Sequence, residues 1–394
     1  MDREVTIAGG GVAGLNLGRE LERRGYETEV FERLPSDGHI EKSIFTLNEL
    51  VEEEGLEETI VNVMDTYRIV TTFDKDLEYS VDDLSHGGCL IDYPSLLDEL
   101  EERYTAEGGT ISYSEGVESV ESLDGSVEIE TEKGRLESKH FVDATGPESN
   151  VLRNSGFLDD DPFVIGMYGS EIIGEFNPDV HYNVFGEEVG KCSWVTPKDE
   201  DRADLIAGSY YRMEDEDMFE ELENRFGFLY ENLDELGIGR TEGLGEEMFM
   251  GFIRTSPVRD IPQDNIHCLG EAAGHTSPYT GDALRPCFYY SNDLAESIDN
   301  DKDFDPSLFD NDTAVAMRNL RIKSYDNIAR LIDLENDMIE GLEEEDMYGL
   351  LKGQDLSNSV KLHLASNLIS NPSNLGIVSK FGLERAKLTA KGII

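Results

Sequence analysis

Three glycines near the start of the chain have the spacing of a turn that holds phosphate. Gly9, Gly11 and Gly14 follow the short apolar run 5–8 directly, in the pattern GxGxxG. The first glycine permits a tight turn, the second lets main-chain N–H groups approach a diphosphate, and the third lets the next helix pack closely. The spacing predicts a dinucleotide-binding turn; the alternative is a glycine-rich turn that serves packing alone.

The residues after the turn predict the helix that must support it. Val12 and Ala13 begin this helix, and their main-chain N–H groups are candidate phosphate contacts at its positive end. Ala13, Leu17 and Leu21 recur every four residues and form one apolar face, and Gly25 ends the helix. A strand, this turn and this helix together are typical of a Rossmann-type fold.

A carboxylate closes the second predicted strand, where the ribose of a dinucleotide would lie. Residues 27–31 predict that strand, and Glu32 follows it at the spacing expected of a ribose-binding acid. A carboxylate here accepts hydrogen bonds from both ribose hydroxyls and disfavours a 2′-phosphate, which argues against NADP at this site. Arg33 is a further candidate contact of the same dinucleotide.

A later segment resembles flavoproteins rather than nicotinamide dehydrogenases. Residues 141–146 form an apolar strand that ends in Asp-Ala-Thr-Gly. This resembles the return to the FAD domain in flavoproteins of the glutathione-reductase and p-hydroxybenzoate-hydroxylase types. The resemblance implies that Ala144, Thr145 and Gly146 contact FAD. Val117 resembles the strand position that passes the adenine in these families, and its alternative is an ordinary strand position.

A second segment, residues 266–274, points to the same flavoproteins. It ends in Gly-Glu-Ala-Ala-Gly and resembles their GDAAG segment, whose acid contacts the ribityl chain of FAD. The resemblance makes Gly270 and Glu271 candidate cofactor contacts. Glu271 stands where the family usually has Asp, which adds one methylene but keeps a carboxylate acceptor.

The turn before the next predicted helix contains a departure from the family pattern. Gly281, Asp282 and Ala283 resemble the loop that brings N–H groups and a helix N-terminus towards the flavin pyrimidine ring. Asp282 replaces a small residue, and a carboxylate beside the ring would oppose an anionic reduced flavin. Its alternative is a helix N-cap that points away.

The middle of the chain predicts a different kind of sheet. Between residues 163 and 252 the pattern changes to alternating strands, which predicts an inserted antiparallel sheet covering the flavin. Trp194 and Pro197 match an aromatic motif of the geranylgeranyl reductase family and are candidate substrate contacts, whereas Cys192 and Thr196 replace two of its aromatic positions. For Trp194 a sheet-core role is the alternative.

The order of these segments predicts an α/β protein with a Rossmann-type FAD-binding domain, an inserted antiparallel-sheet substrate domain and a C-terminal helical region. A chain of 394 residues is too long for one compact core of ordinary size. Tyr93 stands where the superfamily usually has an Arg, so a contact to the cofactor phosphates is expected to be missing. The expected ranges are 1–40, 85–160 and 250–300 for the FAD-binding domain, 41–84 and 161–249 for the substrate or cap domain, and 301–394 for the helical domain.

The resemblance to geranylgeranyl-reductase-like flavoproteins covers about residues 1–300. It implies that reduced FAD delivers hydride to a double bond of an isoprenoid lipid or a related apolar substrate. One alternative is an FAD monooxygenase or a halogenase-like enzyme; another is a flavin electron-transfer or lipid-binding protein without turnover. The electron donor, ferredoxin or NAD(P)H, is left open. The positional candidates for a proton donor are His275, Tyr279, Asp282 and Arg285, and for an isolated His a structural role is the alternative.

The charge of the chain limits its partners. Acidic residues number 85 and basic residues 33, which gives a formal net charge of −52. Such a charge repels phosphate at long range and argues against nucleic acid as a partner. Because the acids are spread along the chain, the composition predicts a protein of an extreme halophile, in which concentrated salt screens the repulsion.

The cysteines and the apolar runs predict a reduced, cytoplasmic protein. No CxxC spacing signals a metal site or a disulfide framework, and no apolar run is long enough to span a bilayer. Residues 379–394 carry four basic residues against one acid, which predicts a peripheral membrane contact or, alternatively, a helix docked on the acidic body. The thiols expected to be free and mostly buried are Cys89, Cys192, Cys268 and Cys287.

Overall fold

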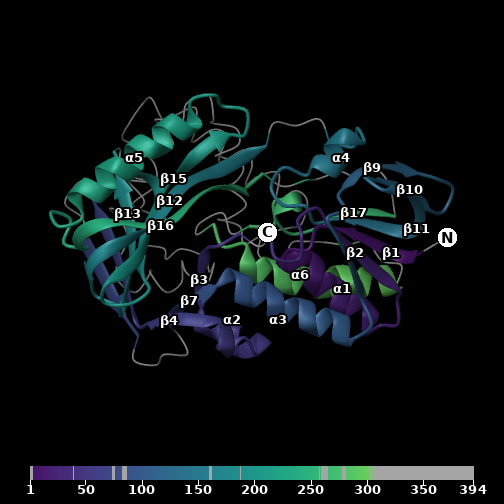
Figure 1. Ribbon diagram of the computed structural model, residues 1–394, viewed down its shortest axis with the longest axis horizontal. Coiled ribbons are helices and arrows are strands. Elements are labelled where there is room, and N and C mark those ends of the chain that lie inside the picture. The colour runs from purple at the N-terminus through teal and green to yellow at the C-terminus, as the bar shows by residue number, and fades with distance from the viewer. Residues whose placement is uncertain are drawn as a thin grey trace, which may run out of the picture.

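In the computed structural model the described residues form two bodies, each built on a seven-stranded sheet, with a small third sheet beside them (Figure 1). The predicted α/β class is confirmed, whereas the expected helical range 301–394 lies outside the described residues except for Phe304. The described residues are 3–38, 40–72, 76–81, 87–158, 162–186, 188–256, 258, 265–276, 281–300 and 304.

The first sheet contains the predicted amino-terminal crossover. Its order is β8-β2-β1-β11-β10-β9, and β17 pairs with β11. The β1–β2, β2–β8, β1–β11 and β11–β17 pairs are parallel, so the carboxyl ends of these strands meet at one edge. The strands are β1 (Arg3–Ala8), β2 (Thr28–Glu32), β8 (Thr110–Tyr113), β9 (Val117–Ser122), β10 (Val127–Thr131), β11 (Gly134–Asp143) and β17 (Ile266–Cys268).

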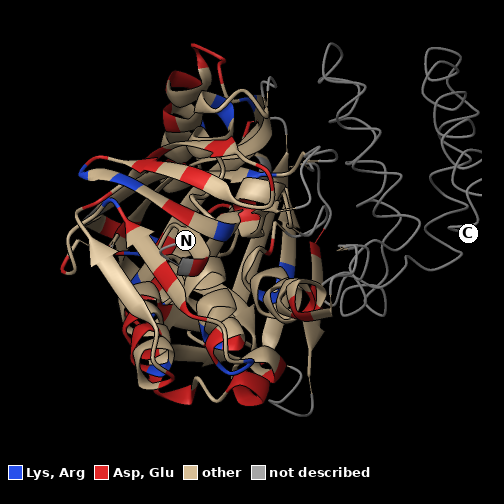
Figure 2. Cartoon of the chain, turned by 90° about the vertical axis from the view of Figure 1, so that its right-hand side faces the viewer, with Lys and Arg blue, Asp and Glu red and all other residues tan. Residues whose placement is uncertain are grey.

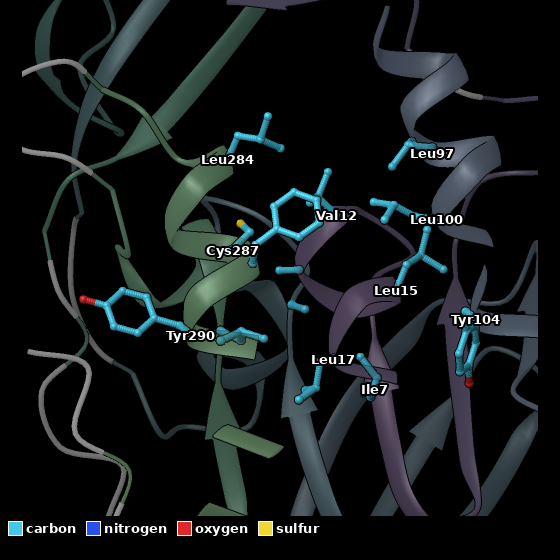
Figure 3. Packing of buried hydrophobic residues seen from close by; sticks show 14 of the residues in the cluster. Ile7, Val12, Leu15, Leu17, Leu97, Leu100, Tyr104, Leu284, Cys287 and Tyr290 are labelled. Carbon is cyan, nitrogen blue, oxygen red and sulfur yellow. The ribbon is translucent and has the colours of Figure 1, made fainter. Parts of the chain in front are cut away.

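Three helices pack together on one face of this sheet. The apolar side of α1 (Val12–Glu22) lies between α3 (Tyr93–Ala106) and α6 (Leu284–Asn300). Figure 3 shows Val12 and Leu15 of α1 between side chains of the other two helices. Because these helices cover the sheet, the amino end of α1 is held firmly beneath the glycine turn.

The second sheet has the order β16-β12-β15-β14-β13-β5-β6, and α5 (Met218–Asn232) packs on one of its faces. The sheet is antiparallel as predicted, apart from the parallel pair of β13 with β5. Periodicity alone does not reveal this exception, because residues far apart in sequence form the pair. The strands are β5 (Thr66–Thr71), β6 (Asp76–Ser80), β12 (Phe163–Phe176), β13 (Val180–Gly186), β14 (Gly190–Pro197), β15 (Arg202–Arg212) and β16 (Gly239–Arg254).

The small sheet lies between the two larger bodies in sequence and in space (Figure 1). Its order is β3-β7-β4, and β7 leads directly into α3. The Asp92 carboxylate caps α3 by accepting the Ser95 N–H at 2.9 Å. The remaining elements are β3 (Ser43–Leu47), α2 (Asn48–Glu54), η1 (Glu57–Thr59), β4 (Ile60–Met64), β7 (Gly88–Asp92), α4 (Asn150–Asn154) and η3 (Gly270–Ala273).

Acidic residues are distributed over helices, strands and loops of the described chain (Figure 2). Three of the four cysteines expected to be free and mostly buried are so, namely Cys89, Cys268 and Cys287, and the side chain of Cys192 is not among those described. Among the described helices, none is both long and apolar enough to cross a membrane.

Candidate functional site

The glycine turn fits its surroundings so closely that side chains are excluded. Gly9 has φ +104°, and a Cβ added there would stand 2.3 Å from the Ala144 carbonyl oxygen. A Cβ on Gly14 would stand 2.0 Å from the Gly9 carbonyl oxygen. The predicted glycine turn and the predicted Asp-Ala-Thr-Gly segment are therefore in direct contact, since the Ala144 N–H donates to the Ala8 carbonyl at 2.8 Å.

The amino end of α1 is a candidate anion-binding site. Gly11 is the N-cap, and no side chain of the described residues caps it. The first turn contains no acid, so the N–H groups of Val12 and Ala13 carry the positive end of the helix dipole without a counter-charge from that turn. Such an end accepts an anionic group such as phosphate.

The Glu32 carboxylate lies beside the turn, at the end of β2. It accepts the Gly10 N–H at 2.7 Å and the Leu34 N–H at 2.8 Å. A carboxylate has about four acceptor positions, so two remain for ribose hydroxyls. A Cβ built on Gly116, which precedes Val117, would stand 3.5 Å from the Arg33 Cβ, so the three predicted contacts Glu32, Arg33 and Val117 lie at the same end of the sheet.

Asp143 has a structural role. Its carboxylate is fully buried and accepts hydrogen bonds from the N–H and hydroxyl of Thr145, at 3.0 and 2.6 Å, and from the Leu152 N–H at 3.3 Å. Burial raises the pKa of Asp143, and these hydrogen bonds and the buried Arg254 counteract the rise. The carboxylate thus fixes the Ala144-Thr145-Gly146 turn rather than meeting a ligand.

Two predicted cofactor segments that are far apart in sequence meet here. The Ser149 hydroxyl donates to the Ala272 carbonyl at 2.7 Å, and the Leu269 N–H donates to the Asp143 carbonyl at 2.9 Å. Gly270 has φ +65°, and a Cβ on it would stand 2.7 Å from the Ala13 Cβ. The structure therefore brings all three segments to the carboxyl edge of the parallel strands.

Glu271 lies in a group of polar side chains beside the amino end of α1. Burial raises the pKa of Glu271, and the nearby Lys42 ammonium opposes the rise. Lys42 Nζ lies 4.4 Å from the centre of the Tyr93 ring. Sequence reasoning did not single out Lys42, because no motif marks it; the signal would have been a lone cation beside an acidic segment.

In the loop before α6, the Asp282 side chain points to the first turn of that helix. Its carboxylate accepts the N–H groups of Leu284 at 3.0 Å and Arg285 at 3.3 Å, and it pairs with the Arg285 side chain at 3.2 Å. These are the bonds of a helix N-cap. Arg285 turns back towards Asp282, and the Ala283 carbonyl accepts the Cys287 N–H at 3.1 Å inside the helix.

His275 lies against aromatic side chains. It is 8 % exposed, and its ring lies 4.5 Å from that of Tyr290 and 5.8 Å from that of Phe304. Its main-chain N–H donates to the Gly270 carbonyl. This enclosure is typical of the structural role. Tyr279, the remaining candidate, lies outside the described residues.

The second sheet presents apolar side chains to this site. Val164 packs towards α5, so alternation along β12 turns Phe163 and Ile165 to the opposite face. A Cβ on Gly281 would stand 3.3 Å from Ile165 Cδ1 and 3.7 Å from Ile253 Cδ1. The loop before α6 therefore meets an apolar wall, which sequence reasoning did not identify because alternation does not say which face meets the other domain.

Trp194 lies on the face of β14 opposite to Val195, which is buried against α5. Its neighbour on that face, Thr196, is within 3.0 Å of His181 Nδ1, and His181 stacks on Phe45 at 3.8 Å between ring centres. Trp194 is therefore turned towards the side of the small sheet.

Pro197 takes part in the junction between two sheets. Its carbonyl accepts the Asn62 side-chain N–H of β4 at 2.9 Å. The same amide donates to the Pro178 carbonyl at 2.8 Å. The backbone at Pro197 thus joins the small sheet to the second sheet.

No protein-family profile and no curated protein sequence matches the chain. Solved structures do share its fold. A geranylgeranyl bacteriochlorophyll reductase-like protein from Thermoplasma acidophilum matches with a TM-score of 0.66 and 18% identity, over 96% of this chain and 99% of that one. The flavin-dependent brominase Bmp2 matches with a TM-score of 0.64 and 13% identity, over 93% and 98% of the two chains.

A third neighbour is PqsL, a probable FAD-dependent monooxygenase from Pseudomonas aeruginosa. It matches with a TM-score of 0.58 and 17% identity, over 89% of this chain and 99% of that one. The chain thus has the fold of flavin-dependent reductase-like, monooxygenase and halogenase proteins. At these identities the likeness defines the fold, and the reaction must be argued from the site.

Proposed function

We propose that the protein is an FAD-dependent oxidoreductase. The observation that carries this proposal is the meeting of the glycine turn, the Ala144–Gly146 turn and the Gly270-Glu271 segment around the uncapped amino end of α1. A diphosphate fits the open N–H groups of α1, and a ribose fits the free acceptor positions of Glu32. The flavin-dependent neighbours support the same cofactor.

We further propose that the substrate is apolar and that the reaction is reduction of an isoprenoid double bond, as in a geranylgeranyl lipid. The apolar wall at Ile165 and Ile253 beside Gly281 supports this choice, because it would align a hydrocarbon chain and exclude water. FAD, when bound and reduced, would supply the hydride. Trp194 and Pro197 remain candidate substrate contacts.

A monooxygenase or halogenase-like reaction is the second candidate. The observation in its favour is that Bmp2 and PqsL share the fold over nearly the same share of the chain as the reductase-like neighbour. Both candidates would use the same cofactor site. They differ in whether the reduced flavin meets an alkene or oxygen.

One experiment separates these reactions. The full chain, purified in strong KCl, should be yellow; it is then reduced without oxygen and mixed with a geranylgeranyl lipid. Flavin reoxidation that depends on the lipid supports the reductase. Reoxidation that requires oxygen and a second substrate supports the monooxygenase, and absence of both supports a flavin-bearing protein without turnover.

The proposed setting is the cytoplasm of an extreme halophile. The acidic composition supports it, and ferredoxin or NAD(P)H would supply electrons. We also propose a peripheral membrane contact through residues 379–394, which lie outside the described residues. Deletion of those residues should abolish flotation with anionic liposomes.

A further inference from the structure

Lys42 places a cation next to the glycine turn. It directly precedes β3, and its carbonyl accepts the Tyr93 N–H at 3.0 Å, which fixes the backbone at the start of α3. The side chain is partly buried, and its ammonium lies over the Tyr93 ring at 4.4 Å from the centre. The backbone bond and the cation–π contact together hold the charge in place.

This ammonium has no ion-pair partner within the part of the chain that the structure describes. The ammonium lies over the Tyr93 ring; burial lowers the pKa of Lys42, and a longer-range attraction to Glu271 opposes that fall. Lys198, which is also partly buried, shows the contrast, because its ammonium pairs with Glu171 at 2.9 Å and Asp204 at 3.2 Å. Removing a charged group from water without a close partner of opposite charge costs free energy. The arrangement therefore favours an anionic ligand.

The surroundings of Lys42 point to where that ligand lies. The Tyr93 hydroxyl stands 3.8 Å from the place a Cβ on Gly11 would take, and Gly11 is the uncapped N-cap of α1. Burial raises the pKa of Tyr93, so its hydroxyl stays neutral and adds no charge of its own. The Tyr93 side chain therefore connects the Lys42 ammonium to the amino end of α1.

We propose that Lys42 is a cofactor-positioning residue whose ammonium binds the diphosphate of the dinucleotide held at the amino end of α1. The inference rests on the proposed function, because it takes FAD as that dinucleotide. The ammonium and the N–H groups of Val12 and Ala13 would then bind the diphosphate from two sides. Tyr93 would keep the ammonium in position through the cation–π contact with its ring.

The test compares three ligands on the flavin-free full chain at fixed KCl, with binding followed by calorimetry. FAD and ADP contain the diphosphate, whereas riboflavin does not. Lys42→Met should weaken FAD and ADP binding by about tenfold or more, the usual effect of losing a charge-assisted hydrogen bond, and leave riboflavin binding unchanged. Lys42→Arg should keep most of the affinity.

Two further variants test whether any loss of affinity comes from the position of the charge rather than from net charge or misfolding. Arg135→Met removes one positive charge from an exposed hairpin and should leave all three affinities unchanged. The double variant Lys42→Met/Tyr93→Arg should regain affinity for FAD and ADP, because it returns a cation to the same space. Far-UV circular dichroism checks that each variant is folded.

The outcomes separate the inference from the function on which it rests. Wild-type protein that binds no FAD overturns both. If wild-type protein binds FAD and Lys42→Met leaves the FAD and ADP affinities as they are in wild type, the inference alone is overturned. Weaker binding of FAD and riboflavin but not of ADP also overturns it, because the contact would then be to the flavin ring.

Discussion

Two acidic side chains of the site differ in what surrounds them. Asp143 is saturated by hydrogen bonds from Thr145 and Leu152, so it serves the turn that carries Ala144. For Glu271 the closest opposite charge is Lys42, with no ion pair between them among the described residues. Asp143 thus has a structural role, whereas Glu271 stays a candidate cofactor contact.

Asp282 shows how a departure from a family pattern is accommodated. As an N-cap it accepts two N–H groups of α6, and Arg285 balances its charge. The carboxylate therefore partly cancels the positive end of α6. If the flavin lies as the resemblance implies, this helix end would stabilise an anionic reduced flavin less than an uncapped one.

Gly9 provides a test of the turn at the scale of one residue. Gly9→Ala should lower the free energy of unfolding by about 2–4 kcal/mol, because the added Cβ meets the Ala144 carbonyl and φ +104° strains a side chain. Urea unfolding measures the change. Gly134→Ala, where a Cβ meets no atom within 4 Å, should change stability little; equal losses in both variants would contradict the explanation.

At the scale of elements, the site depends on two junctions between sheets. Gly281 before α6 packs on Ile165 of β12 and Ile253 of β16, which positions the apolar wall. His181 of β13 stacks on Phe45 of β3 and is within hydrogen-bonding distance of Thr196. The position of the second sheet relative to the first is thus set by side chains from several distant segments.

The second junction predicts a pH dependence. Burial lowers the pKa of His181 from 6.5 to about 3, so below pH 6.5 the unfolded chain binds a proton that the folded chain does not. Stability should therefore be full above pH 6.5 and fall as the pH drops towards 3. Between pH 7 and 5 this one group contributes a loss of about 2 kcal/mol as an upper estimate.

Urea unfolding of wild type and His181→Gln at pH 7 and pH 5 measures this loss. The variant should show a smaller difference between the two pH values. Tyr182→Phe, a neighbouring change that removes no group titrating in this range, should keep the wild-type difference. An unchanged difference in His181→Gln would show that other groups cause the acid sensitivity.

At the scale of the whole molecule, the net charge of −52 dominates. In Figure 2, segments coloured for acidic residues far outnumber those coloured for basic residues. In dilute salt such charges repel one another over about 10 Å, whereas in molar salt the range falls to about 3 Å. Folding should therefore depend on salt more than it does for a protein of balanced charge.

The expected result is a free energy of unfolding that rises steeply between 0.1 and 2 M KCl, as extrapolated from urea titrations. NaCl should act like KCl, since screening depends on ionic strength. A neutral osmolyte at equal osmolarity should reproduce little of the gain. Undiminished stability in dilute buffer would contradict the halophilic interpretation.

The sequence by itself determined the local parts of the site. The run from β1 through Gly9, Gly11 and Gly14 to Glu32 is continuous, and its glycines are required by contacts within one crossover, so short-range pattern predicts it. The Asp-Ala-Thr-Gly and Gly-Glu-Ala-Ala-Gly segments were likewise visible, because each turn has its own residue requirements.

Only the tertiary structure decided which side chains surround these turns. Lys42, Arg254 and Ile165 belong to no motif, and each reaches the site through a strand pairing or a packing contact between distant segments. The same holds for the parallel pairing of β13 with β5. Local propensity carries no information about such contacts, because their free energy arises only when remote surfaces are buried together.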